Sequence, residues 1–187
     1  MKTMKAYMAG LLLIIGLLGF SINCNSQDPK PDKKSKKEAR RAQMEADFRV
    51  LDSMLYNGRY VLEADFLQNK YGTRVWVSST LNFVRVEGPK GVLQTGSDVG
   101  VGYNGVGGVT AEGSINDYKI SRNLKNLSCT VTFNLITNLG TFNILLTVTA
   151  NNNATAAISG STSGRLIWDG HLVAINNSRV FKGSNTI

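Results

Sequence analysis

The sequence has few of the residues from which metal and catalytic centres are usually built. It contains one histidine, His171, and two cysteines, Cys24 and Cys129, so it can form neither a histidine-rich metal site nor a framework of several disulfides. It also lacks the Gly-x-Ser-x-Gly motif of a nucleophile elbow. We therefore expect no metal and no cofactor, and we expect that the protein is not an enzyme.

The charge of the chain is basic but gives no nucleic-acid pattern. Lysine and arginine number 21 and aspartate and glutamate 13, which gives a formal net charge of +8. Lysines are dense in residues 24–37, whereas the later basic residues are scattered and are not interleaved with exposed aromatic side chains. The sequence predicts no nucleic-acid partner.

The N-terminus has the pattern of an export signal. Lys2 and Lys5 precede an apolar run over 8–20, which is shorter than the roughly 20 residues of a membrane-spanning helix. Cys24 stands where a bacterial lipoprotein carries its lipid-modified cysteine. We predict a signal peptide over 1–23 and lipidation of Cys24, which would place the protein in the cell envelope, in the periplasm or tethered to the outer membrane.

Two alternatives to lipidation stay open, because Asn23 is not the small residue that lipoprotein processing prefers before the cysteine. Ordinary signal peptidase cleavage after Ser21 or Ser26 would release a soluble secreted chain. A retained N-terminal anchor is the other alternative.

A flexible tether is predicted over 24–37, since this segment has no aliphatic or aromatic residue with which to offset the entropy of ordering. Its lysines could contact anionic lipid headgroups or acidic glycans, although a solvated spacer is the simpler interpretation. An amphipathic helix is predicted over 38–57, because this region lacks Pro, ends at Asn57-Gly58 and repeats apolar residues at helical spacing: Met44, Phe48, Leu51 and Leu55.

From residue 58 onward the hydrophobic period is two, which indicates β-strands. The clearest pair covers 127–135 and 142–148 and is joined by a turn at 137–140. Gly170 predicts a bulge between strands over 165–169 and 171–175, and the tail from 176 is expected to be less ordered. The fold class is mainly β: an antiparallel meander over 58–187, forming a curved sheet, barrel or sandwich, preceded by one N-terminal helix.

Several residues are weak candidates for function. Cys129 lies in an alternating apolar series and is predicted to be a buried small hydrophobe, with a Cys24–Cys129 disulfide as the alternative. Residues 100–105 spell Gly-x-Gly-x-x-Gly, but no strand–helix unit surrounds them, so a nucleotide site is not predicted. The glycine-rich stretch 96–113 is expected to be a loop or irregular edge strand, or else a flap with Tyr103 and Asn104 as contacts.

Chemical candidates also exist among the predicted strands. His171 with Asp169 and a serine would be a triad, and Glu63 with Asp65 would be an acid pair as in glycoside hydrolysis. A solvated strand face explains both acids more simply. Trp76 and Trp168 could stack on a sugar or an apolar ligand, but tryptophans at alternating apolar positions more often belong to the core.

The outline of the chain resembles domain-of-unknown-function family 4251, which is found in exported proteins and lipoproteins of Bacteroidota. The resemblance covers about 40–175 and rests on the signal, the charged linker, the helix and these segments: 60–66, 84–88, 117–120, the Phe133/Phe142 hairpin and 167–170. Members often carry a Leu-Pro-Tyr-like stretch before the glycines, where this chain has residues 92–96. The resemblance implies no known activity and no functional residues.

Together these observations predict an exported, lipid-anchored β domain that acts as a binding or structural module. The membrane would be reached through the lipid, and an envelope protein or a glycan is the expected partner. Two alternatives remain: a carrier of apolar ligands, if the strands close around a cavity, and a hydrolase of envelope glycans.

Overall fold

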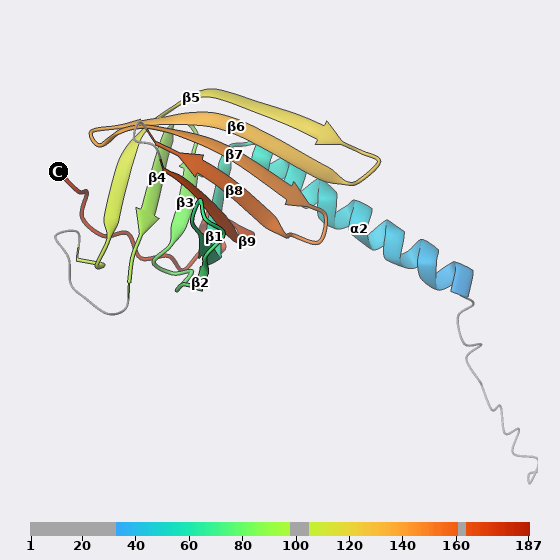
Figure 1. Cartoon of the computed structure of the whole chain (residues 1–187). Helices are drawn as coiled ribbons and strands as arrows, with labels where there is room; N and C mark the ends of the chain where they lie inside the picture. Colours follow the sequence, from blue (N-terminus) through green and yellow to red (C-terminus); the bar gives the residue numbers. More distant parts are fainter. Residues whose placement is uncertain (1–32, 98–104, 161–163) are drawn as a thin grey trace, which may run out of the picture. The chain divides into compact units, whose positions relative to one another are not determined.

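Nine strands and one long helix form most of the computed structural model, which describes residues 33–97, 105–160 and 164–187 (Figure 1). The predicted signal peptide, the lipidation of Cys24, and Tyr103 and Asn104 lie outside these residues. The elements are α2 (Lys33–Tyr56), β1 (Arg59–Gln68), β2 (Arg74–Trp76), β3 (Phe83–Glu87), β4 (Lys90–Thr95), β5 (Val109–Asn123), β6 (Ser128–Thr137), β7 (Gly140–Thr149), β8 (Ala154–Ser159), β9 (Arg165–Ala174) and the short 3-10 helix η1 (Ile175–Asn177).

The strands close into a barrel. They pair antiparallel in the order β2-β1-β3-β4-β5-β6-β7-β8-β9, and β9 also pairs with β1, for example Tyr60 with Ala174. Eight strands thus form a ring. The short β2 pairs with the last residues of β1 and is not part of this ring. The prediction of a mainly antiparallel β domain after one N-terminal helix is confirmed, and of the three arrangements left open the barrel is found.

Alternate residues of each strand point into the barrel, as their period of two requires. The predicted hairpin is confirmed as β6 and β7: Phe133 pairs with Ile144, and Thr137 pairs with Gly140 across a two-residue turn. Cys129 is fully buried inside, as predicted. The interior side chains form one continuous cluster that runs from the helix to β9.

The helix begins earlier than predicted. Residues 33–37, which were assigned to the tether, belong to α2, because no proline lies between Pro31 and the end of the helix and lysine is a good helix former. Residues Lys37–Ile187 form one compact unit. Within it, Leu55 is buried and its carbonyl accepts a hydrogen bond from the Tyr118 hydroxyl at 2.7 Å. Met44, predicted on the same apolar face, is 37% exposed instead.

The seam between β1 and β9 contains the predicted bulge, but on the opposite strand. The strand β9 is continuous, and the register shifts in β1 between Ala64 and Phe66, so Asp65 is the extra residue. Gly170 permits this close approach: a Cβ there would lie 1.9 Å from the Glu63 carbonyl oxygen. Gly170 therefore permits the bulge in β1 and does not interrupt β9, the strand to which it belongs.

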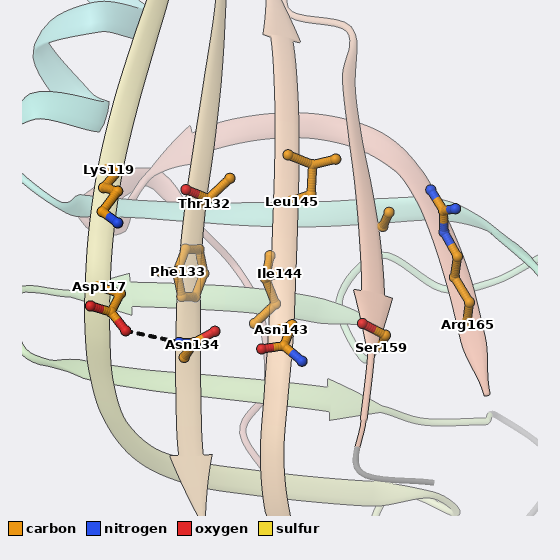
Figure 2. A pocket seen from close by; sticks show the side chains of 11 residues that line it. Asp117, Lys119, Thr132, Phe133, Asn134, Asn143, Ile144, Leu145, Ser159 and Arg165 are labelled. Carbon is orange, nitrogen blue, oxygen red and sulfur yellow. Dashed lines mark hydrogen bonds between the residues drawn. The ribbon is translucent and has the colours of Figure 1, made fainter. Parts of the chain in front are cut away.

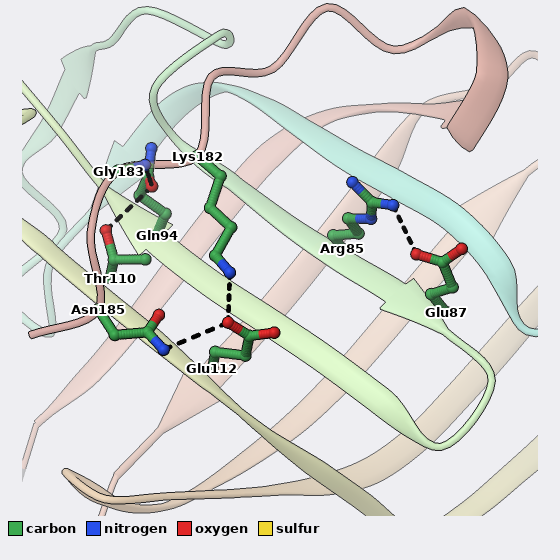
Figure 3. Close-up of polar contacts among 8 residues, drawn as sticks. All are labelled: Arg85, Glu87, Gln94, Thr110, Glu112, Lys182, Gly183 and Asn185. Carbon is green, nitrogen blue, oxygen red and sulfur yellow. Dashed lines mark hydrogen bonds and ion pairs between the residues drawn. The ribbon is translucent and has the colours of Figure 1, made fainter.

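The C-terminal tail lies against the outer face of β3, β4 and β5 and is held by specific bonds (Figure 3). The buried Gln94 side chain donates to the Phe181 carbonyl at 2.8 Å, and its oxygen accepts from the Gly183 amide at 2.8 Å and the Thr110 hydroxyl at 3.0 Å. Lys182 pairs with Glu112. The expectation of a less ordered tail was therefore wrong, because a buried polar residue on β4 fixes its backbone.

Candidate functional site

An apolar pocket of about 320 Å³ opens into the barrel interior. The β5 residue that lines the pocket is Val109, the first residue of that strand. The helix α2 contacts β5 further along, where Tyr118 and Arg122 hydrogen-bond to it. The pocket and the helix therefore lie toward opposite ends of the barrel. The pocket is lined by residues of five strands and of the β8–β9 connection: Leu93, Thr95, Val109, Phe142, Ile158, Gly160, Gly164, Leu166 and Trp168.

Two features of the described residues shape this pocket, which we call the mouth of the barrel. Gly160 and Gly164 contribute no side chain, and the Phe142 ring approaches Gly160 closely enough that a Cβ would stand 3.4 Å from it. Val109 and Leu166 are partly exposed at the rim, although both are apolar. The described lining is thus apolar and concave, which is the usual character of a small-molecule site.

Trp168 brings a buried polar donor to the described wall of this mouth. Its side chain is 1% exposed, which confirms the prediction that it belongs to the core. Its indole Nε1–H has no hydrogen-bond acceptor among the described residues. A buried donor without a partner costs about 1–3 kcal/mol, so such groups usually find an acceptor in the protein, in water or in a ligand.

Three of the predicted chemical candidates come together on the outer face of the β1–β9 seam. His171 lies between the two acids, with Nδ1 at 3.3 Å from Asp65 Oδ2 and Nε2 at 3.7 Å from Glu63 Oε2. The pairing of Glu63 with His171 and the bulge at Asp65 produce this arrangement. Asp169, predicted to join His171, instead contacts Arg74.

A serine that the sequence did not single out completes this cluster. Ser178, just after η1, donates its hydroxyl to Glu63 Oε1 at 2.7 Å. In a nucleophile–histidine–acid triad the hydroxyl would donate to the histidine, so this hydrogen bond is a different arrangement. Within the described residues, no group of three or more His, Cys, Asp or Glu is arranged to hold a metal ion.

Trp76 was expected in the core, and this is wrong: its side chain is 76% exposed. Among the described strands, β2 pairs with β1 alone and lies outside the ring, so Trp76 has no barrel interior to enter. The indole packs against Phe66 instead, with ring centroids 4.3 Å apart. Trp76 is thus a surface aromatic with a fixed position.

A larger and more polar hollow, of about 600 Å³, crosses the outer face of β5 to β9 (Figure 2). Lys119 and Arg165 lie on its two sides. Asp117, held at a φ of 57° by the bulge in β5, accepts a hydrogen bond from Asn134 at 3.1 Å. This hollow was not predicted from the sequence. The only signal for it is that outward-facing positions of β6 and β7 carry amide side chains such as Asn143.

Cys129 has a buried thiol with a raised pKa. Burial, with the nearby Asp52 carboxylate in a smaller role, raises its pKa to about 11. The thiol therefore stays protonated near neutral pH and lacks the nucleophilic thiolate form. Burial likewise raises the pKa of Tyr60, whose hydroxyl meets that of Tyr118 inside the barrel.

These features define a class of protein: an eight-stranded antiparallel barrel that is preceded by one helix and has an apolar mouth. Within that class, the chain belongs to the family described as "Domain of unknown function (DUF4251)", whose model matches residues 42–172. The resemblance seen in the sequence is thereby confirmed. Among the described residues, no helix combines the length and the apolarity that crossing a membrane requires.

A solved structure supports the same assignment. The crystal structure of a DUF4251 family protein from Bacteroides eggerthii DSM 20697 is similar to this chain, with 31% sequence identity and a TM-score of 0.62. The match covers 73% of this chain and 93% of the other. No curated protein matches the chain.

Proposed function

We propose that the protein is an exported, lipid-anchored barrel of the cell envelope that binds an apolar ligand in its mouth without transforming it. The observation that carries the proposal is the buried indole N–H of Trp168 in the wall of an apolar pocket, for which the described part of the chain provides no acceptor. An apolar ligand that also presents one acceptor oxygen would fill the pocket, and this oxygen would pair the donor once the pocket wall shifts to uncover the buried nitrogen. Of the functions considered from the sequence, this one is the carrier of apolar ligands.

The lining of the pocket narrows the chemistry of the ligand. Its volume of about 320 Å³ is near the lower end of ligand pockets, which suits one short chain or ring. The described lining residues include no lysine, arginine, aspartate or glutamate, so they offer a charged ligand end no partner for its lost hydration. A neutral carbonyl, as in an acyl ester or amide, fits better than a free carboxylate.

Binding of a matched pair of probes tests the role of Trp168. Methyl decanoate and decane present similar chains, but only the ester has an acceptor. Replacing Trp168 by phenylalanine keeps an aromatic ring and removes the donor, so affinity for the ester should fall about 3- to 10-fold while affinity for decane changes little. Trp76→Phe is the matched control. Absence of saturable ester binding by the unaltered protein, or equal ester binding by the Trp168→Phe variant, would contradict the proposal.

The envelope part of the proposal has a separate support and a separate test. Lys2, Lys5 and the apolar run over 8–20 form an export signal, and Cys24 offers a site for the two or more acyl chains that stable anchoring needs. Mass spectrometry of the mature N-terminus should find a diacylglyceryl group on Cys24. A free N-terminus at Ile22 or Gln27 would show release by ordinary signal peptidase instead.

A further inference from the structure

A row of side chains crosses the outer face of four neighbouring strands. Trp76 on β2 is paired with Phe66 on β1, Phe66 with Asp169 on β9, and Asp169 with Thr155 on β8. This row, Trp76–Phe66–Asp169–Thr155, is apolar and aromatic at one end and polar at the other. It lies on the side of β9 that faces away from the apolar mouth, because successive residues of a strand point to opposite faces.

Contacts within the row hold its groups in place. The Arg74 guanidinium carbon lies 3.7 Å from the Phe66 ring centroid, and Trp76 packs against the same ring. Arg74 also reaches Asp169 at 3.1 Å, and the Thr155 hydroxyl donates to Asp169 at 2.8 Å. Interlocked groups of this kind lose little entropy when a ligand arrives, so the row is pre-organised.

A hollow of about 400 Å³ lies beside the row. It combines carboxylate, guanidinium and amide groups with an aromatic wall: its lining is Asp65, Phe66, Arg74, Asn153, Ala154, Thr155, Asp169 and Gly170. Planar polar side chains of this kind match the closely spaced hydroxyl groups of a sugar, which donate and accept at the same time. The exposed indole next to them offers a flat apolar face for the C–H side of a sugar ring.

The charge of the hollow limits which sugars can bind. Two carboxylates, Asp65 and Asp169, face one guanidinium, Arg74, so an acidic glycan would meet a net like charge. We propose that this row is a binding site for an uncharged saccharide, with one ring stacked on Trp76 and its hydroxyls bonded to Asp169, Asp65 and Asn153. The site is separate from the mouth and gives the barrel a second ligand class.

Affinity electrophoresis tests this site with defined probes. The protein is run through gels that contain starch, laminarin, xylan, mannan or glycol chitin, with polygalacturonate as the acidic comparison. At least one neutral polymer should retard the protein, and Trp76→Ala should weaken that retardation by at least about tenfold in apparent affinity. Tyr71→Ala is the matched control, because Tyr71 is 81% exposed on the same β1–β2 hairpin but outside the row.

The outcomes separate this proposal from the one for the mouth. Retardation by a neutral polymer that Trp76→Ala removes and Trp168→Phe leaves intact supports the row. No retardation by any neutral polymer, retardation by polygalacturonate alone, or equal retardation of the Trp76→Ala and Tyr71→Ala variants would overturn it. Circular dichroism of each variant shows whether a loss of binding reflects a loss of fold.

Discussion

Replacing Gly170 by alanine should open the seam at which the barrel closes. The added Cβ would stand 1.9 Å from the Glu63 carbonyl oxygen, whereas a close carbon–oxygen contact is about 3.3 Å, so β1 and β9 would have to separate by about 1.4 Å. Overpacking of this kind costs about 1–3 kcal/mol, and each weakened ladder hydrogen bond adds about 1 kcal/mol. We expect a loss of about 3–5 kcal/mol of unfolding free energy.

Urea unfolding followed by tryptophan fluorescence measures this loss, because Trp168 is buried two residues before Gly170. The matched control is Gly164→Ala, since a Cβ at Gly164 would meet no atom within 4 Å. The control should change stability by less than about 1 kcal/mol, and a small gain is expected if alanine restricts the unfolded chain. If both variants unfold at the same urea concentration, the close approach of β1 and β9 does not determine closure.

Three further predictions concern the polar and titratable groups. Gln94→Leu should lower the free energy of unfolding in urea by about 2–4 kcal/mol, because it leaves the buried Gly183 amide without its acceptor. Asn138→Ala is the control: it removes an exposed hydrogen bond to the tail and should cost less than about 1 kcal/mol. Cys129 should resist maleimide at pH 8 until urea unfolds the protein. Stability should fall as pH rises from about 9 to about 11, because the thiol of the unfolded chain ionises at lower pH than the buried one. The fall should be smaller in Cys129→Ala but not absent, because the raised pKa values of Tyr60 and Tyr118 act in the same direction. The hydrogen bond from Lys182 lowers the pKa of Glu112. The natural protein should therefore be more stable than Glu112→Gln near neutral pH, and this difference should vanish as pH falls through the lowered pKa. Acid denaturation scans of the two proteins measure it.

The parts of the fold that sequence predicted are those that local periodicity determines. The β6–β7 hairpin follows from alternating apolar residues on either side of a two-residue turn, and the second half of α2 follows from apolar residues at helical spacing. The stretch 96–113 was expected to be a loop or irregular edge strand because of its glycines, but β5, which pairs on both sides, already begins at Val109. Gly113 is there to let β5 approach β6: a Cβ would lie 1.8 Å from the Ile136 carbonyl oxygen.

The candidate sites depend on contacts that periodicity does not encode. His171 meets Asp65 across a separation of 106 residues, through a pairing of the first and last strands of the barrel. Trp76 and Trp168 both stand in apolar, strand-like segments, yet one is on a strand outside the ring and the other on a strand within it. Their opposite burial follows from the order of strands, which the sequence pattern left open.

The two proposed sites share a strand but use its opposite faces. Trp168 points into the mouth and Asp169, the next residue, points to the outer row, because side chains alternate along a strand. A substitution at either residue should therefore impair one ligand and spare the other. Gly170 fixes the position of β9 against β1, so Gly170→Ala should weaken ester binding and neutral-polymer binding together at a urea concentration where the variant is still folded. Loss of only one would mean that the two faces do not depend on the same seam.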